Sequence, residues 1–325
     1  MVKRLSIIFG SIIVILVVAT VLVGNYFVNY ALVADGSGDD REPNEEVADE
    51  IDIEDLEIIA QTRESQEMRG QSWFVETDNE EVSITTADGY ELYGHTYTHD
   101  EVDEWVFIVH GYKANEMNSI TMAPYFYEAG YNVLTYDLRA HGESEGDFIG
   151  MGYLDGDDLI VWTDYIIENY DDAKVVYHGT SMGAATVMNA VGDEALPDEV
   201  KGFVIDAGFS SIWGIYESEL SHRFGLPTFP VLDMADLMAR IRAGYSFKND
   251  GITVESVSES KIPMLLIHGE NDDFVPVDMA YEIFDAKSEG EKQIEIFEGA
   301  GHSESKYIDE ERYYEVVFEF LDNVY

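Results

Sequence analysis

One serine in this chain has the neighbours that a nucleophile requires. Residues 178–183 read His-Gly-Thr-Ser-Met-Gly, so Ser181 lies at the centre of a Gly-x-Ser-x-Gly pattern. Residues 174–177 before it are mostly β-branched or aromatic, as in a buried strand, and residues 184–190 after it are mostly small or apolar, as in a buried helix. The sequence therefore predicts a strand, a tight turn and a helix with the serine at the corner.

That corner suits acyl-transfer chemistry. A strained backbone would hold the hydroxyl of Ser181 clear of the sheet, while glycines at 179 and 183 avoid collisions with the neighbouring strand and helix. The backbone N–H of Met182, at the start of the helix, would point to the position of a developing oxyanion. The alternative is a glycine-rich turn whose serine takes part in no chemistry.

A serine nucleophile needs a base, and the base needs an acid that orients it. In a parallel sheet such groups lie in loops after the carboxyl ends of strands. The loop 298–303, Glu-Gly-Ala-Gly-His-Ser, follows the last predicted strand, and its glycines would let His302 reach over the sheet edge. The loop 268–276 follows another strand and holds the three carboxylates Glu270, Asp272 and Asp273. Each of them could orient an imidazole, or could instead cap a helix or face solvent in a turn, and the second interpretation is favoured for Asp273.

The segments around these loops alternate between strands and helices. Strands are predicted at 105–109, 131–136, 174–177, 200–206, 264–268 and 293–297, and helices at 119–129, 157–170, 184–190, 279–286 and the C-terminus. Before them, strands are predicted at 73–75 and 82–86, with an antiparallel return strand at 90–98. The predicted fold class is therefore α/β, with a mostly parallel central sheet covered by helices on both faces.

Residues 72–325 resemble the α/β-hydrolase superfamily. Residues 268–276 carry the His-Gly-x-x-Asp-x-x-Val-Pro pattern of the family's acid loop, and 136–144 read Tyr-Asp-Leu-Arg-Ala-His-Gly-Glu-Ser, another recurrent family loop. Residues 110–112, His-Gly-Tyr, resemble the family's oxyanion turn. The most similar subgroup is that of bacterial membrane-associated or secreted hydrolases of the serine aminopeptidase and acyl-esterase type.

The resemblance assigns roles that local sequence leaves open. It implies a nucleophile, acid and base in the order Ser181, Asp272 and His302, and it adds the backbone N–H of Tyr112 to that of Met182 as an oxyanion donor. It also implies that Arg139 and His141 are structural. No metal or organic cofactor is implied.

The N-terminus carries an apolar stretch of membrane-spanning length. Lys3 and Arg4 precede a nearly uncharged run over residues 5–23, which as a helix would span roughly 28 Å. The basic residues before it and the acidic residues after it predict a single-pass anchor within residues 1–34, with the remainder outside the cell. The alternative is a cleaved signal peptide, although only weak small-residue sites are present at 17–19 and 32–34.

Two further segments flank or interrupt the predicted domain. Residues 35–71 are expected to form an acidic linker and possible leading helix. Residues 209–261 are rich in aromatic residues and methionine, and are predicted to form a small helical cap above the serine. Such a lining suits an apolar acyl or aryl group.

Composition narrows the possible partners. The 325 residues include 66 Asp plus Glu against 18 Lys plus Arg, a formal net charge of −48, which repels the phosphates of nucleic acid. There is no cysteine, so disulfides and a cysteine nucleophile are excluded.

Three functions are compatible with these residues. The favoured prediction is a serine hydrolase of carboxylic esters acting outside the membrane on a small-molecule substrate. The alternatives are a peptidase or acyltransferase with the same three residues, and a non-catalytic binding module on the same scaffold.

Overall fold

A computed structural model describes residues 2–34 and 52–325, so most of the predicted acidic linker lies outside the described residues. Eight strands form one sheet in the order β1-β2-β4-β3-β5-β6-β7-β8. The strands are β1 (Glu80–Thr85), β2 (Glu91–Tyr97), β3 (Glu104–Val109), β4 (Asn132–Tyr136), β5 (Lys174–Thr180), β6 (Val200–Asp206), β7 (Met264–Gly269) and β8 (Lys292–Phe297). Strands β1 and β2 pair in antiparallel fashion, as does β2 with β4, and β3 to β8 are parallel. The predicted α/β class with a mostly parallel sheet is confirmed.

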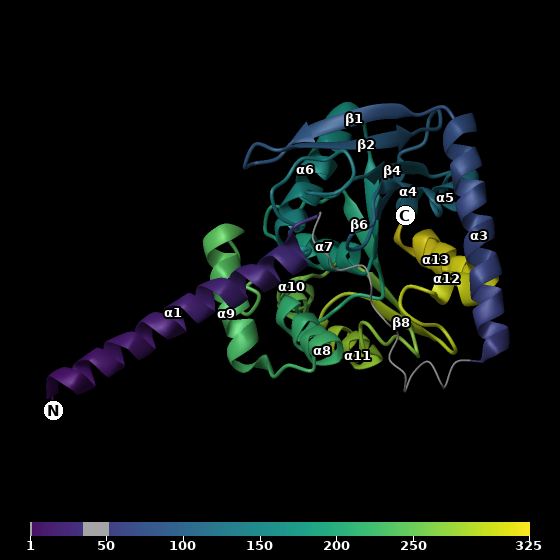
Figure 1. The fold of residues 1–325 in the computed structure, drawn as a ribbon. Coiled ribbons are helices and arrows are strands. Elements are labelled where there is room, and N and C mark those ends of the chain that lie inside the picture. The colour runs from purple at the N-terminus through teal and green to yellow at the C-terminus, as the bar shows by residue number, and fades with distance from the viewer. Residues whose placement is uncertain (1, 35–51) are drawn as a thin grey trace.

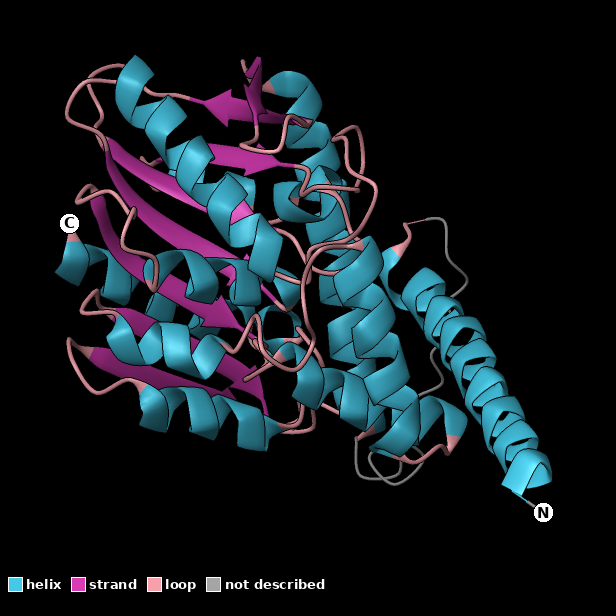
Figure 2. Ribbon diagram, turned by 90° about the vertical axis from the view of Figure 1, so that its left-hand side faces the viewer, coloured by secondary structure: helices cyan, strands magenta, loops and turns pink. Residues whose placement is uncertain are grey.

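Helices cover both faces of this sheet (Figures 1 and 2). They are α1 (Val2–Leu32), α3 (Ile53–Glu76), α4 (Glu116–Ile120), α5 (Ala123–Glu128), α6 (Tyr153–Asn169), α7 (Met182–Val191), α8 (Ile212–Phe224), α9 (Thr228–Arg242), α10 (Thr253–Glu259), α11 (Val277–Ala286), α12 (Ser305–Ile308) and α13 (Glu310–Val324).

The two faces follow from the alternation of side chains along each strand. In β3, Trp105 and Phe107 join a core with α6, α7, α10 and α11. Val106 and Ile108 point the other way, into a second core with α4, α5 and α13. Because both faces are buried, β3 reads as a continuous apolar run.

Two predicted elements are wrong in detail. Residues 73–75 were expected to form a strand, but they lie in α3, which runs unbroken through residue 72, the expected start of the domain. The Trp73 ring centroid lies 4.4 Å from that of Tyr97, so α3 partly buries this aromatic side chain against β2, while Val75 stays exposed. The helix predicted over 119–129 is two short helices, because Pro124 in the first turn of α5 lacks the N–H that would continue α4.

The N-terminal helix has two distinct parts. Residues Ile8–Leu32 are long and apolar enough to cross a membrane. From Ile8 to Leu22 the side chains are mostly exposed, whereas Val28 and Leu32 are fully buried against the rest of the protein. Figure 1 shows α1 running from the distant N-terminus past α9 to the edge of the body. The end of α1 is therefore packed onto the segment that contains α8, α9 and α10, an arrangement that the sequence analysis did not anticipate.

Candidate active site

The corner between β5 and α7 has the predicted strand–turn–helix form. Ser181 follows the last residue of β5 and has φ 56° and ψ −113°, a backbone conformation rare for a residue with a side chain. A Cβ at Gly179 would clash with the carbonyl of Gly183, and one at Gly183 would clash with the carbonyl of Val109. The Ser181 N–H donates to the carbonyl of Asp206 at 2.8 Å, which ties the strained residue to β6.

The structure brings Ser181, His302 and Asp272 together in one hydrogen-bonded chain. The Ser181 hydroxyl lies 2.9 Å from His302 Nε2, and His302 Nδ1 lies 2.8 Å from Asp272 Oδ2. With the imidazole proton on Nδ1, that nitrogen donates to the carboxylate and Nε2 accepts from the hydroxyl. The imidazole is thus oriented to receive the serine proton.

Asp272 is the carboxylate of its loop that contacts His302. Its Oδ1 accepts hydrogen bonds from the N–H groups of Phe274 and Val275 at 2.9 and 2.8 Å. Its Oδ2 also lies 3.3 Å from Nε2 of His268, and the side chain is completely buried. Burial alone would raise the pKa of Asp272, but His302 and His268 outweigh it and hold the pKa well below its usual range. The group at 272 is therefore a fixed anion, whereas Glu270 in the same loop is exposed.

The two predicted oxyanion donors flank the serine. Met182 is the first residue of α7, and Tyr112 lies in the turn that follows β3. That turn is held against the serine, because a Cβ at Gly111 would lie 3.3 Å from Cβ of Ser181.

Two buried histidines fasten this turn to the loop over residues 137–144. His110 donates from Nδ1 to the carbonyl of Gly111 and accepts at Nε2 from the N–H of Leu138, at 2.8 and 3.0 Å. His141 accepts at Nε2 from the N–H of Lys113 at 3.1 Å. Burial lowers the pKa of His110 to about 3 and also lowers that of His141, so both rings are neutral near neutral pH. Both side chains therefore position the turn that carries Tyr112.

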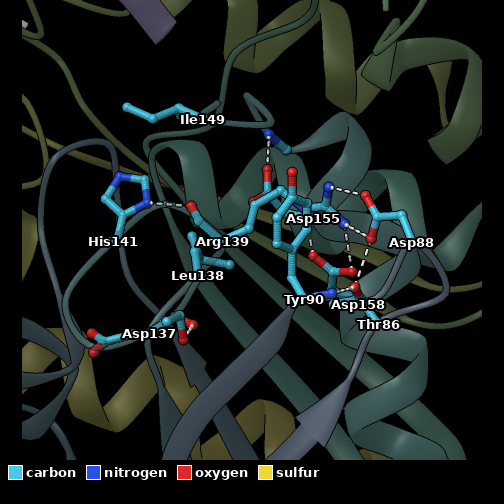
Figure 3. A network of polar contacts seen from close by, with 12 residues as sticks. Thr86, Asp88, Tyr90, Asp137, Leu138, Arg139, His141, Ile149, Asp155 and Asp158 are labelled. Atoms are coloured by element: carbon cyan, nitrogen blue, oxygen red, sulfur yellow. Dashed lines mark hydrogen bonds and ion pairs between the residues drawn. The ribbon is translucent and has the colours of Figure 1, made fainter. Parts of the chain in front are cut away.

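Arg139 anchors the same loop to its neighbours (Figure 3). Its guanidinium forms two hydrogen bonds of 2.7 Å with Asp158 in α6, and a third of 3.1 Å with Asp88. Arg139 and Asp158 are almost completely buried. The arginine thus joins the site loop to a helix and to the β1–β2 hairpin.

We expect Arg139→Met to lower the free energy of unfolding by about 3–5 kcal/mol, because it leaves the buried carboxylate of Asp158 without its cation. Denaturant titration measures this loss. The matched control is Lys174→Met, which removes a half-exposed ion pair with Glu104 and should cost less than about 1 kcal/mol. Equal losses for the two variants would show that the buried pair has no special structural role.

Ser181 lies where two cavities of different character meet. The first is lined almost entirely by apolar and aromatic side chains, mostly from α1, α8 and α9. The second lies between α3, α4 and α12, and contains Arg63, Glu67 and Lys306.

The sequence analysis missed the contribution of α1 to the first cavity. Phe27, Tyr30 and Ala31 line it beside residues of the predicted cap. One signal was available, because Asn25 and Asn29 interrupt the apolar run four residues apart and give the end of this helix two unlike faces.

Within residues 2–34 and 52–325, no group of three or more His, Asp or Glu side chains is arranged to hold a metal ion.

Comparisons with known proteins agree with this fold. Residues 100–223 match the family model of the serine aminopeptidase S33 hydrolases. An uncharacterized protein, YqkD of Bacillus subtilis, is 29% identical over 246 residues, which cover 74% of this chain and 78% of that protein. The lysophosphatidylserine lipase ABHD12 of Macaca fascicularis is 31% identical over 163 residues, which cover 48% of this chain but only 37% of the lipase. The solved structure of the Pyrococcus furiosus esterase Pf2001 has a TM-score of 0.63 at 23% identity, covering 76% of this chain and 92% of the esterase.

Proposed function

We propose that this chain, which has the fold of the α/β-hydrolases and matches a model of that family over residues 100–223, is a serine hydrolase of carboxylic esters that acts through an acyl-enzyme. The observation that carries the proposal is the hydrogen-bonded chain from Ser181 through His302 to Asp272. A strained serine, an imidazole and a buried carboxylate in this order are the parts that nucleophilic acyl transfer needs.

In the proposed reaction, the Ser181 oxygen attacks the ester carbonyl while His302 Nε2 takes the hydroxyl proton. The N–H groups of Met182 and Tyr112 stabilise the resulting oxyanion, each contributing roughly 3–4 kcal/mol as in comparable sites. Asp272 stabilises the imidazolium, which then protonates the leaving alcohol. Water, deprotonated by the same imidazole, cleaves the acyl-enzyme and restores the serine.

The two cavities support an ester with unlike halves. The apolar cavity suits an apolar acyl group, since its walls include Phe209, Phe247 and Leu232. The second cavity offers charged and hydroxyl groups that suit a polar alcohol. Ser181 lines both cavities, so a carbonyl at the serine would divide the substrate between them.

A peptidase or acyltransferase is the second candidate, because the matching family model is named for serine aminopeptidases. An aminopeptidase must also neutralise the free amine of its substrate. Among the described residues that line the apolar cavity, the carboxylate that could bind such an amine is that of Glu219. Arg223 already forms an ion pair with it at 2.6 Å. This pairing favours the ester hydrolase.

We expect kcat/KM for p-nitrophenyl esters with medium or long acyl chains to exceed that for aminoacyl p-nitroanilides by at least roughly tenfold. Parallel assays of the two substrate series measure the ratio, with Ser181→Ala as the background. Faster turnover of the anilides would reverse the assignment in favour of a peptidase.

The proposed location of the protein depends on its N-terminal helix. The apolar stretch of α1 is a candidate membrane span. With Lys3 and Arg4 before it and an acidic chain after it, the proposed arrangement is a single-pass anchor with the hydrolase outside the cell. Protease added to intact cells should therefore digest the domain. A domain that is digested only after the cells are lysed would contradict this arrangement.

A further inference from the structure

We propose that the substrate is a single-chain ester amphiphile of the membrane, and that its acyl chain reaches Ser181 along α1, which forms one wall of the acyl cavity. The proposal rests on the ester-hydrolase function proposed above. It adds the substrate class and gives the N-terminal helix a part in substrate binding.

The end of α1 is built into the site. Phe27, Tyr30 and Ala31 line the apolar cavity, and Val28 and Leu32 between and after them are fully buried. Four residues before Val28, a Cβ at Gly24 would clash with the backbone carbonyl of Met234 in α9. The two helices thus meet at a glycine, without space for a side chain.

Hydrogen bonds fix the last turns of α1 to the catalytic side of the cavity. The carbonyl of Ala31 accepts from the hydroxyl of Tyr112 at 2.8 Å, and the carbonyl of Leu32 accepts from the N–H of Ile149 at 2.8 Å. Tyr112 is the residue whose N–H is proposed to bind the oxyanion. Tyr30 accepts a further hydrogen bond of 2.8 Å from Arg223 in α8. The wall is therefore a fixed part of the site and not a loosely tethered anchor.

The position of the membrane follows from the length of the same helix. If residues 5–23 span the bilayer, the helix leaves the hydrocarbon layer at Gly24, where it meets α9. The cavity-lining residues Phe27 and Ala31 then lie within roughly 12 Å of helix beyond that point. The residues of α1 that line the cavity therefore follow closely on the proposed membrane span.

The exposed side of α9 suits contact with lipid. Phe229, Leu237 and Ile241 are exposed by 75%, 46% and 67%. Arg240, which is exposed, and Arg242, which is partly buried, lie at the end of the same helix. The whole chain has only 18 Lys plus Arg in 325 residues, so two arginines two positions apart are a local concentration of positive charge. Exposed apolar side chains beside arginines are typical of surfaces that lie in the membrane interface.

The polar cavity accounts for the other half of such a substrate. Arg63, Asn118 and Lys306 contribute to it on the side of Ser181 away from α1. A polar alcohol group would remain there while the acyl chain occupies the apolar cavity. An amphiphile with one chain fits this division, because the carbonyl carbon lies at the junction of its two parts.

The first experiment narrows the apolar cavity by placing a larger side chain on α1. The full-length protein is placed in phosphatidylcholine vesicles, and kcat/KM is measured for 1-stearoylglycerol and for p-nitrophenyl butyrate per site labelled by a small fluorophosphonate. We expect Ala31→Trp to lower the ratio of long-chain to short-chain kcat/KM by at least roughly tenfold. The control Ala34→Trp, at an exposed position three residues further on, should leave the ratio unchanged. An unchanged ratio in Ala31→Trp would overturn the proposal.

A second pair of variants covers the case in which Ala31→Trp does not fold. Gly24→Val should displace α1 from α9 and lower the same ratio, whereas Gly10→Val, whose new side chain meets nothing within 4 Å, should not.

A third measurement tests the route through the membrane. Wild-type protein should hydrolyse 1-stearoylglycerol that is in the same vesicles as the protein at least roughly tenfold faster, in initial rate, than 1-stearoylglycerol supplied in separate vesicles. Equal initial rates would show that the chain does not arrive through the membrane. If wild-type protein hydrolysed neither ester and Ser181 were not labelled, the proposed function itself would be contradicted.

Discussion

Ser181→Ala is expected to reduce kcat for ester hydrolysis by about 10⁶-fold, the effect of removing a serine nucleophile from a comparable triad. The variant keeps His302, Asp272 and the two N–H groups of Tyr112 and Met182, so a residual rate above that of water should remain. Stopped and continuous assays with p-nitrophenyl butyrate measure kcat, with protein that is purified free of wild-type enzyme.

A matched control separates the loss of the nucleophile from the loss of a buried hydroxyl. Ser305 is fully buried, and its hydroxyl has no hydrogen-bond partner among the described residues. Ser305→Ala should therefore leave kcat close to the wild-type value. If Ser181→Ala kept more than a small percentage of wild-type activity while remaining folded, another group would have to be the nucleophile.

Asp272→Asn is expected to reduce kcat by about 10⁴-fold, because it changes the tautomer of His302 rather than the shape of the site. The N–H groups of Phe274 and Val275 would hold the amide oxygen, as they now hold Oδ1 of the carboxylate. The amide NH₂ would then face His302, which would have to accept at Nδ1 and carry its proton on Nε2. An Nε2–H cannot take the proton of Ser181.

The control for this substitution is Asp273→Asn, the same change at the adjacent residue, which lies outside the hydrogen-bonded chain from Ser181 to Asp272. We expect it to preserve kcat. Proton NMR gives a second measurement, the downfield signal of the proton on His302 Nδ1. This signal should disappear in Asp272→Asn, whereas a change in stability alone would leave it in place. Equal kinetic effects at positions 272 and 273 would contradict the assignment of the acid.

Much of the fold could be predicted because the order of its elements is encoded locally. Strands such as β3 and β7 are continuous apolar runs, and the helices between them show the periodicity of surfaces that bury one side. The error at Trp73 has a physical reason. An aromatic side chain is buried as readily from a helix as from a strand, and only its contact with Tyr97 in the folded protein decides between them.

The site was harder to predict than the fold. The corner at Ser181 is marked by its glycines, but local sequence does not single out Asp272 from the other carboxylates of its loop. What distinguishes Asp272 is the curvature of its loop, which turns the N–H groups of Phe274 and Val275 onto its carboxylate. Only the resemblance to a family with this loop singled it out beforehand.

Periodicity gave only a weak indication of the part played by α1, through the polar face that Asn25 and Asn29 form at its end. Apolar side chains such as Phe27 serve a membrane span and the wall of a cavity equally well, so residue type does not distinguish the two. The distinction depends on where α9 lies in space, and on Gly24, which permits close contact between the two helices.

The measurement that tests the central claim most directly is the mapping of the residue that reacts with a fluorophosphonate. The full-length protein is labelled, digested and examined by mass spectrometry. We predict one stoichiometric adduct on the oxygen of Ser181, formed quickly in wild-type protein and much more slowly in Asp272→Asn. An adduct on a different residue, or ester hydrolysis that persists with Ser181 unmodified, would contradict the claim that this serine is the nucleophile.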